Sequence, residues 1–561
     1  MAKLKFGLIV DDVDLPLLLA EMVQTAATSD LYSIDHLIVQ QPPQLAVKPK
    51  TLAQKAALLF KPRELESRLR FRLFRLIVGL ERFMLLRREE TSIYLQTTPL
   101  EQTGLPAITV TPEVSDSGIF YSYTAADLQS IENLGLDGLI RGGSGVLKGD
   151  ILSLCRFGVL SFHHGDNDQF RGGPAGFWEV YRREKSTGFI IQKLGAEIDG
   201  GDVFVKGSIG TQETYLQNQI KLYRKSGRFM HLLLEKIAQN GELPEARTPV
   251  PYANPLFLFK PDLHVQIAYL WRYCWMYFMM QVDAVLGRGW RWGVSYQFVD
   301  DWQSAVLWRS KEIKNPPNHF IADPFVISRD GKHYIYVEDY DYATMKGVVT
   351  VYEVDRHGYK DLGLVLEEDF HLSYPYLLEH KGELYMIPES EQKREIRMYR
   401  CTDFPLKWEL HKVLMSDIAS TDSTLFEHNG KWWMFTNVDS AGVEDHDSEL
   451  HIFHADAPDS TDWTPHAQNP VIFDSLFARM GGLLSDDAGH KYRVYQKQGF
   501  AVYGEAMGIA KIEQLDENKY RESIIVEIEP TFYKGLRGTH TYSYDDGLLA
   551  IDHLRWSRLN D

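Results

Sequence analysis

Short apolar runs alternate with a helical pattern at the start of the chain. Residues 4–10 (LKFGLIV) and 33–39 (SIDHLIV) predict β-strands, and residues 15–28 between them have the spacing of a helix. A strand, a helix and a second strand open a parallel α/β sheet. The same alternation resumes at Ile108 and ends in a long helix, predicted over residues 213–239. This part of the chain therefore predicts a parallel α/β domain.

A basic segment, about residues 46–92, interrupts that alternation. Residues 46–90 hold 12 Lys and Arg against 5 Glu. One apolar stripe of helical spacing is formed by Leu65, Leu69, Leu73, Leu76, Leu80 and Met84. We interpret it as an inserted helix that packs on its own domain. The alternative is a basic amphipathic helix, residues 62–90, on a membrane surface or a lipid-linked saccharide.

From about residue 300 the pattern changes to short strands that repeat. The copies are GKHYIYVE (331–338), GELYMIPE (382–389), GKWWMFTN (430–437), GHKYRVYQ (489–496) and, more weakly, DGLLAIDH (546–553). Each copy follows another apolar strand, and the spacing of roughly 50–60 residues is near that of propeller blades. Five such units predict an all-β, five-bladed β-propeller over residues 299–561.

Residues 211–298, between these regions, are interpreted as a helical linker. Its apolar and aromatic part, residues 265–286, carries Arg272 and Asp283. Those charges favour a buried interdomain helix over a membrane span, and a segment at a membrane interface is the other alternative. The fold prediction is therefore a multidomain protein, with an α/β parallel-sheet domain at residues 1–210, this linker and the propeller.

Composition and charge limit the function. The net charge of −17 argues against nucleic acid as a partner, because phosphate binding needs a basic surface. Cys155, Cys274 and Cys401 show neither metal-ligand spacing nor pairing, so we expect no metal site and no disulfide framework. The N-terminal MAKLKFGLIVDD predicts a first strand and not a signal peptide. We expect a cytoplasmic protein, with peripheral attachment to the inner membrane as the alternative; the sequence leaves the oligomeric state open.

Residues with chemical potential gather in residues 158–202. An apolar strand leads into His163, a turn follows to Arg171, and a second strand delivers Asp199 inside a Gly-Gly turn. A histidine at a strand end, with a carboxylate arriving from a neighbouring turn, is how an α/β sheet builds a proton-transfer site. Each residue alone is more often structural, but their order and spacing together favour a function.

This stretch resembles the folate-dependent formyltransferases, which formylate methionyl-tRNA, glycinamide ribonucleotide and nucleotide-linked amino sugars. His163 matches the family histidine, Arg171 with Gly172 matches the end of the family loop, and Asp199 matches the family aspartate. Ser161 stands where the family has an asparagine whose amide helps to hold the formyl oxygen. The resemblance covers about residues 1–210 apart from the basic segment.

The resemblance implies that an amine attacks the formyl carbon of 10-formyltetrahydrofolate. His163 and Asp199 would be catalytic, with Ser161 beside them. His163 would stabilise the tetrahedral intermediate or exchange a proton with it, and Asp199 would orient the site and help to move a proton through water. A glycine-rich run before the motif would border the folate, because glycine lets the backbone approach closely. The residues predicted to bind this co-substrate are Arg141, Gly142, Gly143, Gly145 and Arg171.

Polar residues also recur at equivalent positions of the repeat in the second half. Equivalent positions in a propeller form a ring of like depth, and acidic and aromatic groups around a cavity suit sugar hydroxyls or, if paired, glycoside cleavage. The predicted substrate-binding residues are Asp323, Glu338, Tyr374, Glu389, Asp422 and Gln496.

The second half resembles the five-bladed propellers of arabinanase- and levansucrase-like glycosidases. It resembles more closely the propeller of glucosamine inositolphosphorylceramide transferase-like proteins. The motifs Ala-Asp-Pro-Phe, Tyr-Pro-Tyr, Met-Ile-Pro-Glu-Ser, Tyr503-Gly504 and His540-Thr541 carry that resemblance. It implies carbohydrate binding more firmly than hydrolysis.

We therefore expect an N-formyltransferase that acts on an amino sugar, nucleotide- or lipid-linked, and whose propeller binds the sugar. One alternative is a glycoside hydrolase or glycosyltransferase with its carboxylates in the propeller and a degenerate formyltransferase domain. The other is a non-enzymatic glycan-binding protein.

Overall fold

The computed structural model describes residues 3–12, 14–41, 62–85, 97–98, 104–166, 168–169, 171–197, 200–247, 257–258 and 261–558. The chain divides into two compact units, residues 1–208 with 212–274, and residues 209–211 with 275–561. The predicted catalytic Asp199 and residues 46–61 and 86–92 of the basic segment lie outside the described residues.

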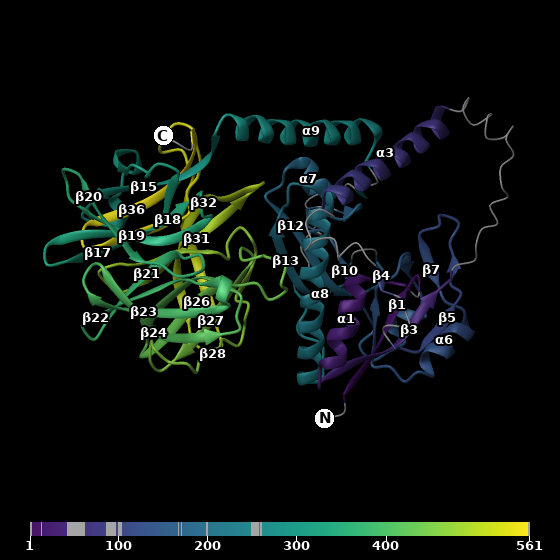
Figure 1. Ribbon diagram of the computed structural model, residues 1–561. Helices are drawn as coiled ribbons and strands as arrows, with labels where there is room; N and C mark the ends of the chain where they lie inside the picture. The colour runs from purple at the N-terminus through teal and green to yellow at the C-terminus, as the bar shows by residue number, and fades with distance from the viewer. Residues whose placement is uncertain are drawn as a thin grey trace. The chain divides into compact units, whose positions relative to one another are not determined.

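A seven-stranded sheet forms the centre of the first unit (Figure 1). Its order is β13 (Asp202–Gly210), β12 (Ser186–Lys193), β10 (Val159–His163), β8 (Gly138–Arg141), β1 (Leu4–Val10), β3 (Tyr32–Gln40) and β5 (Ala107–Val110). The strands from β10 to β5 pair in parallel, whereas β12 runs antiparallel to β10. Shorter pieces of this unit are β2 (Leu15–Pro16), β4 (Thr97–Thr98), β6 (Glu113–Val114), β7 (Phe120–Ser122) and β9 (Val146–Leu147). The parallel α/β domain predicted from the apolar runs is confirmed.

Helices cover this sheet. They are α1 (Leu17–Thr28), α6 (Ala125–Glu132), α7 (Phe177–Arg182) and α8 (Tyr215–Asn240). Helix α8 packs on α1 and β12, and the two helices approach so closely that a Cβ on Gly227 would lie 2.6 Å from Leu18 Cδ1. Residues 215–240 therefore belong to the α/β unit and not to a linker.

The other end of the predicted linker belongs to the second unit. Strand β15 (Arg288–Phe298) pairs antiparallel along its whole length with β36 (Leu548–Arg558). This pairing could not be predicted from the local pattern, because the two strands lie at opposite ends of the unit's sequence. The linker prediction therefore holds for neither end of residues 211–298.

Helix α9 (Leu263–Val285) forms the middle of that segment. Val265, Gln266 and Tyr269 are its buried residues, whereas Trp271 is 67% exposed and Phe278 is 55% exposed. The expected buried interdomain helix is therefore wrong for the residues beyond Tyr269. Within the described residues, none of the helices is both long and apolar enough to cross a membrane.

Helix α3 (Pro62–Leu85) confirms a helix in the basic segment, but not its predicted buried face. Ile77 is 2% exposed, whereas the predicted stripe residues Leu76 and Leu80 are 53% and 41% exposed. The reason is Glu81, which is buried and accepts hydrogen bonds from the Leu216 N–H, 2.7 Å away, and from the Tyr269 hydroxyl. A hydrophobic count could not predict that a carboxylate would turn toward the first turn of α8.

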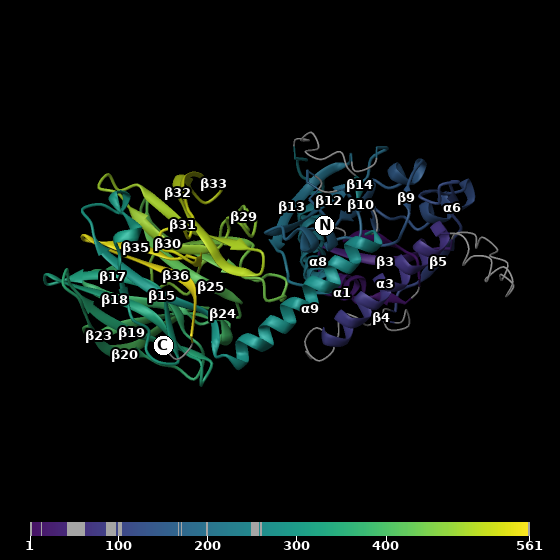
Figure 2. The same cartoon turned by 90° about the horizontal axis from the view of Figure 1, so that it is seen from above.

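Five antiparallel sheets make up the described second unit (Figure 2). The first sheet consists of β17 (His319–Arg329), β18 (Lys332–Asp341), β19 (Lys346–Val354) and β20 (Tyr359–Leu366), and the second of β21 (Ser373–His380), β22 (Glu383–Glu389), β23 (Glu395–Asp403) and β24 (Lys407–Ser416). The third consists of β25 (Ser420–His428), β26 (Lys431–Val438), β27 (Glu449–Ala455), β28 (Thr464–Pro465) and β29 (Ile472–Phe473), and the fourth of β30 (Met480–Ser485), β31 (Lys491–Gly499), β32 (Val502–Leu515) and β33 (Tyr520–Ile528). The fifth joins both ends of the unit and consists of β16 (Lys311–Ile313), β15, β36, β34 (Leu536–Gly538) and β35 (Tyr542–Asp545).

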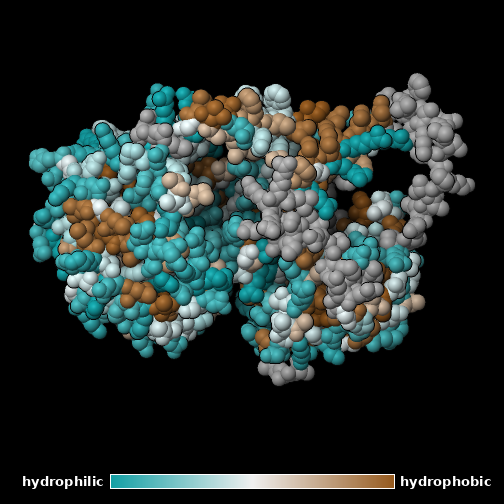
Figure 3. Space-filling view, in the orientation of Figure 1, coloured by the Kyte–Doolittle hydropathy of each residue, from teal (hydrophilic) through white to brown (hydrophobic). Residues whose placement is uncertain are grey.

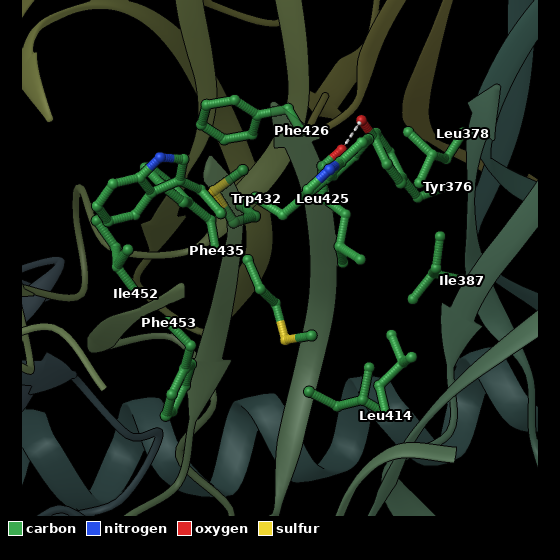
Figure 4. Close-up of a cluster of buried hydrophobic side chains, with 14 of the residues drawn as sticks. Tyr376, Leu378, Ile387, Leu414, Leu425, Phe426, Trp432, Phe435, Ile452 and Phe453 are labelled. Carbon is green, nitrogen blue, oxygen red and sulfur yellow. Dashed lines mark hydrogen bonds between the residues drawn. The ribbon is translucent and has the colours of Figure 1, made fainter. Parts of the chain in front are cut away.

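The sheets follow one another around a closed circuit. Strand β17 contacts β21, β21 contacts β25, β25 contacts β30, β30 contacts β35, and β35 contacts β17. Neighbouring sheets bury apolar side chains against each other, as Figure 4 shows for Leu378 and Ile387 facing Leu425. The Tyr376 hydroxyl donates to the Leu425 carbonyl across this contact, at 2.7 Å. A circuit of small antiparallel sheets is the arrangement of a β-propeller.

Candidate functional sites

The carboxyl ends of β1, β8 and β10 form one edge of the parallel sheet. Strand β1 lies between β3 and β8, so the strand order reverses beside it, and ligands of such sheets bind outside the carboxyl ends at that point. Asp11 follows β1, Arg141 ends β8, and Ser161 and His163 lie at the end of β10. The predicted residues Arg141, Ser161 and His163 therefore lie at the edge where the parallel sheet was expected to bind a ligand.

Ser161 and Arg141 face each other across β8 and β10. Arg141 Nη1 lies 3.5 Å from Ser161 Oγ, and the same guanidinium donates to the Gly145 carbonyl. The Ser161 side chain is buried, and its hydroxyl donates to the Phe162 carbonyl at 3.1 Å. Arg141 therefore connects Ser161 to the glycine-rich loop.

The two adjacent histidines have different surroundings. His164 Nε2 lies 2.9 Å from Ser226 Oγ, and the ring packs on Tyr223. Burial, helped by the nearby His163, lowers the pKa of His164 to about 3. His164 is therefore a neutral packing residue, and His163, half-buried at the strand end, remains the catalytic candidate.

The glycine-rich loop packs tightly on its own domain. The Ser144 N–H donates to both oxygens of Asp11, at 2.8 and 3.0 Å. A Cβ on Gly142 would lie 2.7 Å from Leu19, and one on Gly145, whose φ is +78°, would lie 2.6 Å from the Tyr121 ring. Gly142 and Gly145 therefore allow the loop to pack closely on its own domain, whereas the prediction concerned only a close approach to the folate. The exposed Gly142 and Ser144 leave the outer side of the loop open to a ligand.

The remaining residues of the first half are less informative. Arg171 lies in β11 (Arg171–Gly172), which pairs with β14 (Phe257–Leu258). Asp166, three residues after His163, accepts from Lys206 Nζ at 2.7 Å. Because an aspartate held in an ion pair is a poor hydrogen-bond donor, Asp166 does not replace the amide that Ser161 lacks.

The second unit contains a cavity of about 570 Å³, within the range of small-ligand pockets. Asp323, Glu338 and Glu389 line it, as predicted residues that the structure brings together. Tyr374, Asp422 and Gln496 do not appear in its lining, because they are buried behind it: the Tyr374 hydroxyl, for example, lies 3.0 Å from Thr424 Oγ1. The lining also contains residues that were not predicted, among them Trp290, Trp292, His371, Arg479, Tyr503 and His540.

A repeated irregularity explains the equivalence seen in the sequence. Asp323, Tyr374 and Asp422 have φ values of 49°, 45° and 53°, and each lies at a register shift in the first strand of its sheet. Bulges and left-handed backbone of this kind cluster at functional sites and redirect side chains. Ala322, just before Asp323, pairs with Glu338, as Ser373 pairs with Glu389. Both predicted positions of each repeat therefore meet at the same end of the sheet.

His540 lies between two buried carboxylates. Its Nε2 is 3.1 Å from Asp323 Oδ1 and its Nδ1 is 2.7 Å from Asp552 Oδ2. Burial opposes the charged imidazolium, but Asp552 and Asp323 outweigh it and raise the pKa of His540 to about 10. Burial likewise opposes ionised Asp323, and the charge of His540 still holds the pKa of Asp323 below its usual value. The pair is therefore an imidazolium beside a carboxylate.

The same three residues form the group that could hold a metal ion among the described residues. Each offers one ligand atom, and these atoms lie within 4.8 Å of one another. Carboxylates and neutral imidazole suit several divalent ions, so an ion at this position would have to displace the proton that His540 carries here. The residues come from three distant segments, so spacing in the sequence gave no signal for them.

Arg479 lines the pocket and connects Glu389 of the lining to two acidic residues beyond it. Its Nε lies 2.7 Å from Asp422, its Nη1 3.0 Å from Asp447 and its Nη2 3.8 Å from Glu389. Arg479 pairs with Gln496 at the start of its sheet, where the equivalent residues are the small Ala322 and Ser373. The repeat pattern therefore did not mark it.

The carboxyl groups of the pocket separate into two classes. Burial, with the charge of Asp422, raises the pKa of Glu389 to about 8. Burial, with the charges of Asp323 and Glu389, raises the pKa of Glu338 well above its usual value. At neutral pH Asp323 is therefore ionised while Glu389 is mostly protonated, and Glu338 holds its proton to a higher pH than a free glutamate does. Neighbouring carboxyl groups with separated pKa values are the arrangement that supports acid–base catalysis.

Comparisons with known proteins find two kinds of relative. Residues 305–545 match a family described as glucosamine inositolphosphorylceramide transferase 1, N-terminal. The protein of that name from Oryza sativa subsp. japonica is 36% identical over 210 residues, 37% of this chain and 28% of the rice protein. The chain thus spans less than a third of that relative's length. Its second unit is similar to the N-terminal part of a transferase.

A methionyl-tRNA formyltransferase from Ralstonia nicotianae is 25% identical over 174 residues, 29% of this chain and 53% of that protein. The solved catalytic domain of an α-L-arabinofuranosidase from Coprinopsis cinerea is similar with a TM-score of 0.33 and 10% identity, over 47% of this chain and 97% of that one. The fold assignment rests on the strand pairing and not on this last likeness.

Proposed function

We propose that this chain is a carbohydrate-modifying transferase with two working parts. The α/β unit moves a formyl group from 10-formyltetrahydrofolate to an amino group of a nucleotide- or lipid-linked sugar. The five sheets are the five blades of a propeller that binds sugar. The observation that carries the proposal is the meeting of His163, Ser161 and the loop 141–145 at one sheet edge, in formyltransferase order. The distant similarity to methionyl-tRNA formyltransferase supports it.

The residues at the sheet edge have separate roles in this proposal. His163 donates a hydrogen bond to the formyl oxygen as negative charge develops there. Asp199 and water carry the proton that the attacking amine loses to N10 of the folate, whose bond to the formyl carbon breaks as the new C–N bond forms. The open side of the loop at Gly142 and Ser144 holds the folate, which supplies the formyl group.

The pocket of the second unit supports sugar binding. Trp290, Trp292 and Tyr503 offer aromatic faces to the apolar side of a sugar ring. Asp323 and Arg479 offer charged partners to hydroxyl groups. The name of the rice relative refers to glucosamine and to an inositol-linked ceramide, which supports a sugar or lipid-linked partner.

Glycoside cleavage or glycosyl transfer in the pocket is the second candidate. The observation that favours it is the separation of pKa values between ionised Asp323 and protonated Glu389. In this case Glu389 would protonate a leaving oxygen while Asp323 acts as the base.

Mass spectrometry of amino-sugar nucleotides incubated with 10-formyltetrahydrofolate tests the proposal. A formyl mass gain that His163→Ala removes is the expected result. No gain with any amino sugar tried, and no folate binding, would overturn it. Glycan cleavage or transfer lost in Asp323→Asn and Glu389→Gln, but kept in His163→Ala, would support the second candidate. Glycan binding without either reaction would leave a glycan-binding protein.

A further inference from the structure

Helix α3 has a second apolar face that the fold leaves in contact with solvent. Leu69, Leu76, Leu80 and Phe83 are 45%, 53%, 41% and 56% exposed. Their spacing of seven, four and three residues puts them on one side of the helix. Soluble proteins rarely expose a contiguous apolar surface of this kind unless it binds something.

Helix α9 carries a matching stripe of larger side chains. Ile267, Trp271, Trp275 and Phe278 follow one another at intervals of four, four and three residues. Each is more than half exposed. Figure 3 shows hydrophobic residues gathered along α9 and α3. We call these two stripes together the α3–α9 face.

The orientation of α3 is fixed by contacts on its opposite side. Glu81, which is 2% exposed, accepts from the Leu216 N–H and the Tyr269 hydroxyl, so a turned helix would leave these two buried donors without their acceptor. Contacts to α9 and to the residue before it add to this hold: the Tyr273 hydroxyl lies 2.8 Å from the Met84 sulfur, and Arg70 lies 2.6 Å from Asp262. The exposed stripe of α3 therefore cannot rotate inward without breaking buried contacts.

The charge of α3 is opposite to that of the whole protein. Its sequence holds six arginines and three glutamates, whereas the chain has a net charge of −17. Arg68, Arg72 and Arg75 are exposed, on the side of the helix away from Ile77 and next to the apolar stripe. A basic helix with an apolar stripe complements anionic headgroups above an apolar layer.

We propose that the α3–α9 face docks on an anionic lipid bilayer. Leu69, Leu76, Leu80 and Phe83 enter the headgroup boundary, and the exposed arginines meet lipid phosphates. The tryptophans of α9 have the side chain that is enriched at membrane–water interfaces. This inference does not depend on the proposed function, since it concerns neither the sheet edge nor the pocket.

Co-sedimentation of the full chain with vesicles tests the proposal. Vesicles of phosphatidylcholine alone are compared with vesicles that also contain phosphatidylglycerol. We expect binding to the anionic vesicles that weakens as salt is raised. Arg72→Gln with Arg75→Gln should weaken it about fivefold for each arginine. Trp271→Gln with Trp275→Gln should weaken it further, through lost apolar insertion.

Matched controls use residues of similar exposure outside the face. Trp308 is 61% exposed, and Ile524 and Ile525 are 50% and 54% exposed, so their replacement by Gln should leave binding unchanged. Failure of the wild-type chain to bind either vesicle would overturn the proposal. A dimer in light scattering would also overturn it if Trp271→Gln with Trp275→Gln converted that dimer to monomer. In that case a second copy of the chain would occupy the face. If the tryptophan variants unfold, the arginine pair decides.

Discussion

The edge of the α/β sheet and the pocket of the second unit are built in different ways. At the sheet edge, Ser161 and His163 lie on one strand, and Arg141 on the neighbouring strand, within a short stretch of sequence. In the pocket, Asp323, His540 and Asp552 come from opposite ends of the unit and are joined by close contacts between charged groups. The first site depends on a local motif, and the second depends on closure of the whole circuit of sheets.

This difference determines how each site should respond to a substitution. A residue of the sheet edge can be removed without leaving a buried charge alone, so the loss should fall on chemistry. A residue of the pocket takes part in a network of buried charges, so the loss should fall first on stability.

The largest effect should come from His163→Ala. If the sheet edge carries formyl transfer, the rate should fall about a hundredfold or more, because general acid–base catalysis contributes that much. The measurement is the rate of formyl transfer to an amino sugar, with the melting temperature as a test of folding. The exposed His264 gives the matched control, and His264→Ala should keep the wild-type rate. A lower melting temperature of His163→Ala would mean that His163 stabilises the fold. The sheet edge would then not differ from the pocket in its response to a substitution.

Arg479→Met should destabilise the second unit strongly. It leaves Asp422, which is 2% exposed, without its partner at 2.7 Å, and losing one member of a buried pair costs about 3–5 kcal/mol. Thermal unfolding of the full chain measures this. Lys407→Met, at the exposed ion pair with Asp403, is the matched control and should not shift the melting temperature measurably. Adding Asp422→Asn to Arg479→Met should recover part of the loss; no recovery would mean that Arg479 acts through packing.

The same difference explains how far the sequence could predict the molecule. Strands at residues 4–10 and 33–39, and the repeats of the second half, were predicted because each shows its own periodicity. Part of the cavity lining, Asp323, Glu338 and Glu389, could be predicted because the repeat marks equivalent positions in successive sheets. Substrate binding by these residues stays a prediction, and so does catalysis by Asp199, which lies outside the described residues.

The errors arose where contacts over long distances in the sequence decide the structure. Strand β15 pairs with β36, so a segment read as linker completes a sheet. Helix α3 buries Ile77 and Glu81 in place of the predicted leucine stripe, because a hydrogen-bonded carboxylate fixes the helix. His540 and Arg479 were missed as site residues because neither stands at a marked position of the repeat. Periodicity shows which side chains are apolar, but not which partner they meet.

The smallest effect, and the last to distinguish the two regions, is a dependence of stability on pH. The folded-state pKa of His540, about 10, lies above its ordinary value of 6.5, so its stabilising effect is complete below pH 6.5 and is lost as the pH rises toward 10. Glu389, with a folded-state pKa of about 8 against 4.5, loses its contribution between those values in the same direction. Asp323 acts oppositely, but only below its ordinary value of 3.8. The melting temperature of the second unit should therefore fall between pH 6 and pH 9. Glu389→Gln should make that fall smaller. Glu427→Gln, at an exposed position, is the control and should leave the fall unchanged. If the melting temperature depended on pH equally in the wild type and in Glu389→Gln, Glu389 would not titrate in this range. Glu389 could then not serve as the general acid of the pocket.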